Sequence, residues 1–195
     1  LHDAVEKYYL YDRTAAVAHP YFRYVSWGFP ESKLPHLSNI IEVLKDQNIT
    51  MDRRSRLIGM YAAYLMKWNK SEFAAYRPEE ELKFEWRGVI IHARLDNVVS
   101  TYDGSKRLLE IKTTSEDLSE RADRLADDIQ ALFYMWAYYL VHGEKLDGVL
   151  FRVLKKCKFR QKYGESEQAF SDRIIKDYLI DPSKYASETF VSKND

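Results

Sequence analysis

The stretch from Val89 to Thr114, VIIHARLDNVVSTYDGSKRLLEIKTT, constrains the fold of this chain more than any other. Two runs of β-branched and apolar residues flank the turn signal Asp103-Gly104, a pattern that predicts a β-hairpin. Side chains alternate along a strand, so Glu110 and Lys112 share one face of the second strand. Their apolar neighbours are typical of a central strand, where a charged side chain normally has a partner or a function.

The length of the hairpin loop decides whether Asp96 joins this pair. A two-residue loop would place Asp96 opposite Ile111, on the other face of the hairpin. A three-residue loop, Tyr102-Asp103-Gly104, places it opposite Glu110 instead, and such loops commonly end in a left-handed residue such as glycine. Two facing carboxylates repel each other unless a cation lies between them or one stays protonated. The longer loop therefore predicts a divalent metal site, while a solvated ion pair stays open from the hairpin alone.

Composition excludes several other classes of protein. The chain has 195 residues, of which 46% are hydrophobic, enough for one domain with a packed core. Thirty basic residues balance thirty acidic ones, which argues against indiscriminate coating of nucleic acid but allows local basic patches. The single Cys157 excludes a disulfide framework, a cysteine-only zinc site and a cysteine-ligated iron–sulfur cluster within the chain.

The same features suggest a setting for the protein. One cysteine favours a reducing, cytosolic environment. We expect no membrane span, because no uninterrupted apolar run is long enough, and no signal peptide, because the first residues are charged and aromatic. The chain begins at Leu1 without a methionine, so we expect a fragment or a processed form.

Patterns along the chain predict the other elements. Residues 1–50 are expected to be an accessory, mostly helical region, and residues 51–70 form an apolar helical pattern after the capping residue Thr50. Residues 79–86 alternate as a first strand. A long helix is predicted over residues 119–142, ended by Gly143, followed by a fourth strand at 147–154 and an amphipathic helix at 166–180. The core stripe of the long helix is predicted to be Leu125, Ile129, Leu132, Phe133, Trp136 and Leu140.

The predicted fold class is therefore α/β (α+β), with a mixed central sheet flanked by helices in one domain of residues 1–195. Its core, residues 51–156, has the order helix, three strands, helix and strand, and residues 157–195 form a C-terminal extension. A basic run follows the fourth strand and is predicted to contact backbone phosphates, although a solvated charge run is an equally good explanation. The run consists of Lys155, Lys156, Lys158, Arg160 and Lys162.

This arrangement resembles the PD-(D/E)XK nuclease superfamily, and within it the RecB-type and phage-type exonucleases. Asp96 in HARLDNVV matches the aspartate of motif II, and Glu110-Ile111-Lys112 matches the (D/E)xK motif. Gln130 and Tyr134 in QALFYMWAYYL match the QxxxY motif of the RecB-like branch. The resemblance covers about residues 51–156, and the joint spacing of the motifs is more specific than any one of them.

One position departs from that branch. RecB-like members often carry a metal-binding histidine on the first helix, in a pattern like GxxxH, where this chain has Ala63. His92 does not replace it, because four residues of strand separate it from Asp96 by roughly 13 Å.

The resemblance implies a metal-dependent deoxyribonuclease that hydrolyses phosphodiester bonds, most similar to RecB-like exonucleases of DNA recombination or repair. Asp96, Glu110 and the Ile111 carbonyl make an oxygen-rich set suited to Mg²⁺ or Mn²⁺, with Glu81 as a candidate further ligand. Lys112 would orient or deprotonate a water molecule, or stabilise negative charge.

Gln130 and Tyr134 line the same pocket by the resemblance, whereas the residues alone would suggest only polar groups at the flank of a helix. A site-specific or structure-specific endonuclease and a catalytically inactive DNA-binding module stay open as alternatives. The resemblance also implies DNA as partner, a recombinase, helicase or single-strand-binding partner, and the cytoplasm of a bacterial or phage-infected cell. It implies neither strand polarity nor oligomeric state.

Overall fold

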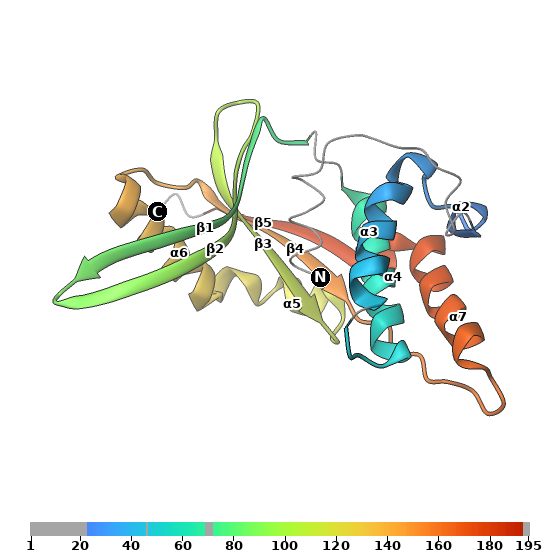
Figure 1. Ribbon diagram of the computed structural model, residues 1–195. Helices are drawn as coiled ribbons and strands as arrows, with labels where there is room; N and C mark the ends of the chain where they lie inside the picture. Colours follow the sequence, from blue (N-terminus) through green and yellow to red (C-terminus); the bar gives the residue numbers. More distant parts are fainter. Residues whose placement is uncertain (1–22, 46, 69–71, 193–195) are drawn as a thin grey trace. The chain divides into compact units, whose positions relative to one another are not determined.

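The computed structural model describes residues 23–45, 47–68 and 72–192 (Figure 1). The chain divides into two compact units. The first consists of residues 1–69 and 154–187, and the second of residues 70–153 and 188–195. The sequence predicts one domain with an accessory region (1–50), a core (51–156) and a C-terminal extension (157–195). This division stays a prediction.

The first unit contains three longer helices. They are α3 (Leu34–Lys45), α4 (Met51–Lys67) and α7 (Glu167–Ile180), with the short elements α2 (Arg23–Ser26), η1 (Glu31–Lys33) and η4 (Pro182–Lys184). The helical character expected of residues 1–50 is confirmed for residues 23–45, and residues 1–22 lie outside the described residues. As predicted, Thr50 caps α4, because its side chain accepts a hydrogen bond from the Arg53 backbone N–H.

α4 packs against both α3 and α7. Gly59 allows the close approach to α7, because a Cβ atom at this position would overlap the Tyr178 ring. Ala63, at the position where RecB-like members often have histidine, is fully buried in α4. The small residues of this helix therefore serve its packing within the first unit.

A five-stranded mixed sheet has the order β1–β2–β3–β4–β5. Its strands are β1 (Ala75–Trp86), β2 (Val89–Ser100), β3 (Lys106–Thr114), β4 (Gly148–Lys155) and β5 (Ala186–Ser192). The pairs β1/β2 and β2/β3 are antiparallel. The start of β4 lies beside the start of β3, where the Asp147 backbone N–H donates to the Lys106 carbonyl over 2.8 Å, so these two strands run parallel. The predicted fold class and the order of elements in the core are confirmed.

Arg152 explains how the unpredicted edge strand β5 is joined to the sheet. Its side chain is fully buried in β4, and its Nε atom donates to Glu188 Oε2 of β5 over 2.7 Å. A second carboxylate, that of Glu72, also pairs with its guanidinium group. A buried charge needs such partners to offset its loss of hydration.

The predicted helix over residues 119–142 is wrong as a continuous element. The structure has α5 (Leu118–Ala122), η3 (Leu125–Asp127) and α6 (Ile129–His142) instead. Asp128 has an extended backbone, and its carboxylate accepts a hydrogen bond from the Ala131 backbone N–H over 3.0 Å, so a new helix begins there. Gly143 ends α6 in the left-handed conformation, as predicted.

The predicted core stripe of this helix is also wrong in part. Leu125 is buried, but Ile129 is 80% exposed and Leu132 and Leu140 are each 41% exposed. α6 instead buries Ala131, Ala137 and Tyr138, and it packs against β1, β2 and β3. The sequence from Ile129 to Val141 contains no charged residue, so its apolar periodicity does not identify one core-facing side.

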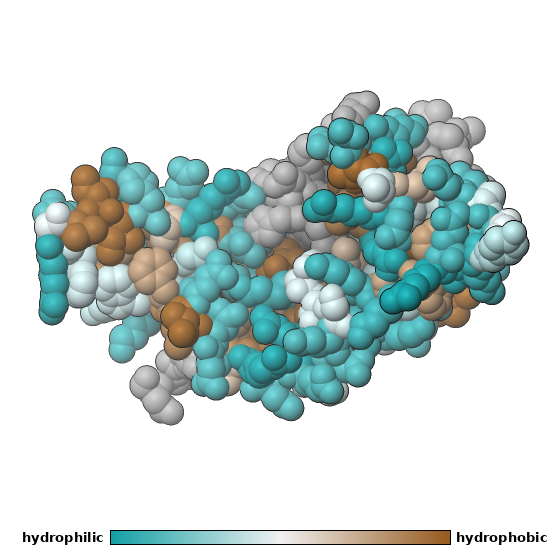
Figure 2. Space-filling model, turned by 90° about the horizontal axis from the view of Figure 1, so that it is seen from below, coloured by the Kyte–Doolittle hydropathy of each residue, from teal (hydrophilic) through white to brown (hydrophobic). Residues whose placement is uncertain are grey.

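The second unit accordingly has apolar side chains on its surface. Figure 2 shows them at the end where the β1–β2 ribbon and α6 lie, at the left of both views. Trp86 at the end of β1 is 41% exposed, and its ring packs edge-on against Trp136 of α6 at 5.5 Å between centroids. No helix in the described part of the chain is both long and apolar enough to cross a bilayer.

Candidate active site

The loop between β2 and β3 has the predicted three residues. The Thr101 backbone N–H donates to the Ser105 carbonyl over 2.9 Å, and the Gly104 N–H donates to the Thr101 carbonyl over 3.0 Å. Gly104 has a φ of +88°, the left-handed conformation that the loop requires. Asp103 fixes the loop through hydrogen bonds from Thr101 and Ser105, which lower the pKa of its carboxyl to about 2.

This loop sets the pairing of the two strands that carry the candidate carboxylates. Val98 lies opposite Leu108, and Asn97 lies opposite Leu109. The next position in this register places Asp96 opposite Glu110, so both side chains are on one face of the sheet. The prediction of an odd, three-residue loop with Gly104 in the left-handed conformation is confirmed, and a metal site shared by Asp96 and Glu110 stays a prediction.

Regular pairing stops at Asp96 on both of its sides. The β2/β3 ladder ends at Asn97, and the β1/β2 ladder omits the position where Glu79 would face Asp96. Glu79 has a φ of +50°, which is uncommon for a residue with a side chain. The Asp96 carboxylate instead accepts a hydrogen bond from the Ile111 backbone N–H over 3.1 Å. That bond ties Asp96 to β3 next to Glu110.

The Glu110 carboxylate is buried, and only one of its two oxygens contacts a cation in the described part of the chain. Its side chain is 1% exposed, and its Oε2 atom lies 3.2 Å from Lys112 Nζ. Its Oε1 atom is buried and has no hydrogen-bond partner among the described residues. Burial, and then the nearby charge of Asp96, raise the pKa of Glu110 to about 7, against the opposing effect of Lys112. The predicted repulsion between the two acids is therefore present in the fold.

Lys112 lies among three oxygen acceptors. Its Nζ atom is 2.6 Å from Gln130 Oε1, 3.2 Å from Glu110 Oε2 and 3.6 Å from Asp128 Oδ2. The Gln130 contact is a hydrogen bond, whereas Asp128 at 3.6 Å is a contact between charges. The Gln130 amide in turn donates to the Tyr134 hydroxyl over 2.8 Å. The structure therefore joins Glu110, Lys112, Gln130 and Tyr134 in one polar cluster.

Asp128 belongs to this cluster and was not predicted from the sequence. One carboxylate oxygen caps α6, while the other faces Lys112 and lies 4.0 Å from Arg121 of α5. An aspartate directly before an apolar helical run is a helix-start signal. A helix predicted over residues 119–142 hides this signal, because position 128 then falls inside the helix.

The remaining predicted site residues do not join the cluster in the described contacts. Glu81 is exposed on β1 opposite Arg94. His92, which is predicted to lie outside the site, is exposed on β2 opposite Lys83. The basic run belongs to the first unit, where Lys155 ends β4 and the other members, Lys156, Lys158, Arg160 and Lys162, are exposed. Its predicted contact with DNA stays a prediction.

The chemistry of the cluster fits a hard divalent cation. The described residues contain no group of three His, Cys, Asp or Glu side chains arranged to hold a metal ion. Magnesium, however, is often bound by only one or two carboxylates, with water and phosphate oxygens completing its shell. Asp96 and Glu110 supply two, and the partnerless Glu110 Oε1 atom is a buried acceptor that a cation would satisfy.

Comparison with known families places the chain. A model of the PD-(D/E)XK nuclease superfamily matches residues 1–186, and the chain therefore belongs to this superfamily. A comparison with curated proteins found no match. One similar solved structure, described as the crystal structure of SSO0001, is 16% identical with a TM-score of 0.34, over 91% of this chain and 82% of that chain. This similarity is too low to carry an argument, and the RecB-like branch stays a prediction.

Proposed function

We propose that this chain is a metal-dependent deoxyribonuclease that hydrolyses phosphodiester bonds, as a RecB-like exonuclease in DNA recombination or repair. Membership of the superfamily supports the nuclease class. The observation that carries the proposal is the buried Glu110 carboxylate, which has one oxygen without a partner, faces Asp96 and contacts Lys112. A structural ion pair would not need a second acid beside it, because that acid opposes ionisation of the first.

The two carboxylates and the Ile111 carbonyl are the proposed holders of Mg²⁺ or Mn²⁺. Such a cation, when bound, neutralises charge on the scissile phosphate and lowers the pKa of water. Burial keeps Glu110 in one position, and the Ile111 N–H keeps Asp96 in another. The protein thus fixes both acids before substrate arrives, which reduces the reorganisation needed during reaction.

Lys112 is the proposed electrostatic group. Gln130 and Glu110 hold its Nζ atom by short contacts, and Tyr134 fixes the Gln130 amide. From this position an ammonium group can donate to a phosphate oxygen and stabilise the negative charge that develops there. Asp128 supports the same position, because it fixes the start of α6 and faces Lys112.

DNA is the proposed substrate, and Lys155, Lys156, Lys158 and Arg160 are proposed contacts to its backbone. A recombinase, helicase or single-strand-binding protein is the proposed kind of partner. The endonuclease and binding-module alternatives differ from the exonuclease in what they do to closed circular DNA.

Cleavage assays with metal titration test the proposal. The chain should degrade linear DNA from its ends only with added Mg²⁺ or Mn²⁺, and Asp96→Ala or Glu110→Ala should abolish this without unfolding the protein. Glu85→Ala is the matched control, because Glu85 is an exposed acid of the same sheet that is no candidate ligand. Full activity in excess chelator would contradict the proposal. Discrete fragments from a closed plasmid would favour a site-specific endonuclease, and binding without cleavage an inactive module.

A further inference from the structure

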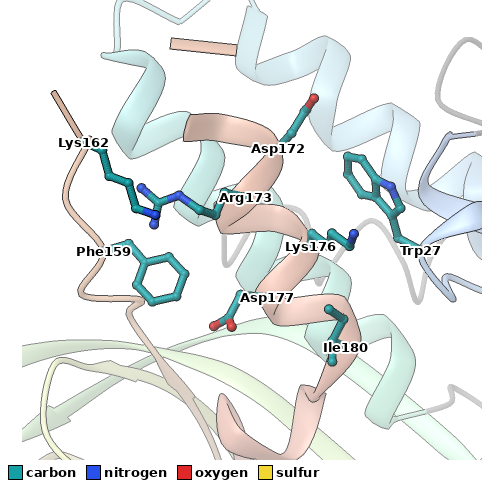
Figure 3. A pocket seen from close by; sticks show the side chains of 8 residues that line it. All are labelled: Trp27, Phe159, Lys162, Asp172, Arg173, Lys176, Asp177 and Ile180. Carbon is teal, nitrogen blue, oxygen red and sulfur yellow. The ribbon is translucent and has the colours of Figure 1, made fainter. Parts of the chain in front are cut away.

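A hollow on the surface of the first unit lies along α7. Its residues are far in sequence from Asp96 and Glu110. Its volume is about 620 Å³, within the range of ligand-binding clefts. Its wall combines rings, an aliphatic side chain and cations, namely Trp27, Phe159, Ile180, Lys162, Arg173 and Lys176. Figure 3 shows Trp27 and Lys176 on one side of α7, and Phe159 and Lys162 on the other.

The cations of the hollow outweigh its acids. Asp172 accepts a hydrogen bond from the Gln168 amide over 2.8 Å, and Asp177 is paired with Lys184 at 3.1 Å and also binds the Tyr185 hydroxyl. No ion pair involves Lys162 or Lys176 in the part of the chain that the structure describes, and both side chains are exposed. The hydrogen bond from the Gln168 amide leaves the charge of Asp172 in place. Three cations against two acids in the lining still leave a positive balance, which suits an anionic ligand.

The ring of Phe159 is held by Arg173. The Arg173 guanidinium lies 5.0 Å from the centre of the Phe159 ring and is itself fixed by Glu165 at 2.8 Å. The same guanidinium lowers the pKa of Glu165 to about 2, so the pair stays charged at neutral pH.

The ring of Trp27 packs against a buried aromatic ring. Its centre lies 5.4 Å from that of Tyr24, which is 1% exposed. The indole also lines the hollow. Rigid rings beside cations are the combination by which proteins bind single-stranded nucleic acid, with bases stacked on rings and phosphates at basic side chains.

We propose that this hollow binds single-stranded nucleic acid, with a base against Trp27 and backbone phosphates at Lys176 and Lys162. The proposal rests on the proposed function, in that DNA is the substrate of the chain. Residues 155–162, KKCKFRQK, contain five basic and no acidic residues and include Phe159, so positive charge continues from the hollow along the chain. A duplex would not fit this chemistry, because its bases are stacked on one another and leave no face for Trp27.

The first test uses the fluorescence of Trp27 in the full chain. An oligothymidylate is titrated into the Asp96→Ala variant, which prevents cleavage. Binding should quench tryptophan fluorescence, and Trp27→Phe should remove the Trp27 part of that quench while retaining the affinity. Trp27→Ala should weaken binding at least about fivefold, because one stacked base is lost. A quench unchanged by Trp27→Phe would overturn the proposal, and so would an equal loss of duplex binding in Trp27→Ala.

The second test concerns the two lysines and does not depend on Trp27. Lys162→Gln combined with Lys176→Gln should reduce the slope of log affinity against log salt by about 1.4, since each phosphate contact on a single strand contributes about 0.7. Lys83→Gln combined with Lys145→Gln is the matched control, because these exposed lysines belong to the second unit. An unchanged slope in the first pair, or an equal change in the control pair, would overturn the proposal.

The two proposals fail in different ways. If the wild-type chain cuts DNA but neither the Trp27 nor the lysine variants alter single-strand binding, only the binding site is wrong. If those variants behave as expected but the wild-type chain never cuts DNA with Mg²⁺ or Mn²⁺, the nuclease proposal is wrong and the binding site stands.

Discussion

Glu110 should make the stability of this protein fall as the pH rises through neutrality. The pKa of its carboxyl is raised from 4.5 to about 7, first by burial and then by Asp96. The folded state therefore holds this proton more tightly than the unfolded state does. The contribution of Glu110 to the free energy of unfolding is fully present below about pH 4.5 and is lost as the pH rises through about 7. At 1.36 kcal/mol for each pKa unit, the loss is about 3 kcal/mol.

Urea denaturation with chelator present, at about pH 5 and about pH 8.5, measures this loss. The wild-type chain should lose about 3 kcal/mol between the two values, whereas Glu110→Gln should lose far less, since an amide does not ionise. Glu81→Gln, a change to an exposed acid, should behave like the wild type. Asp103 and Glu165, each with its pKa lowered to about 2, titrate below this interval.

Metal should reverse the loss if Glu110 is a ligand. A cation that binds only the folded, ionised form stabilises it by mass action. Added Mg²⁺ or Mn²⁺ at the higher pH should therefore raise the stability of the wild type and leave Glu110→Gln unchanged. Equal stability of the wild type at both pH values, or the same loss in Glu110→Gln, would refute the link between stability and the Glu110 proton.

Three further changes test other parts of the site. Gly104→Val should cost about 1 to 2 kcal/mol in denaturation experiments, because a β-branched residue is strained at positive φ; an unchanged stability would contradict the loop geometry. Asp128→Ala should lower the free energy of unfolding by about 1 kcal/mol, because the helix cap is lost, and should also reduce activity. Asp128→Asn should keep the cap but reduce cleavage about tenfold. Cleavage equal to wild type in Asp128→Asn would restrict Asp128 to a structural role. Neutralising Lys155 and Lys156 to Gln should reduce the salt slope of duplex binding by about 1.8, and an unchanged slope would favour a solvated charge run.

The hairpin could be predicted because its geometry is local. Gly104 and its neighbours define the loop, and the alternation of a strand then fixes which side chains share a face with Glu110. The interruption at Asp96 could not be predicted, since the apolar pattern of β2 continues through it. Its cause is a contact between strands, in which the Ile111 N–H binds the Asp96 side chain.

The helix that borders the site was predicted less well, for physical reasons. Residues 129–141 are uncharged on every side, so periodicity selected a stripe that includes the exposed Ile129. The Asp128 cap depends on a single residue within a strong helical pattern. The edge strand β5 was missed although ASETFVS alternates, because seven residues near the end of the chain give a weak signal.

The interruption at Asp96 divides β2 into two segments with different constraints on length. Residues 97–100 pair with both β1 and β3, whereas the described partners of residues 89–95 are in β1 alone. The outer segment ends at the Arg87-Gly88 turn, where both residues have positive φ. Equal numbers of residues can be inserted into both outer strands there without moving Asp96 relative to Glu110. Insertions and deletions in relatives are therefore expected at Arg87-Gly88 and not at Tyr102-Asp103-Gly104, where one extra residue would turn Asp96 to the opposite face.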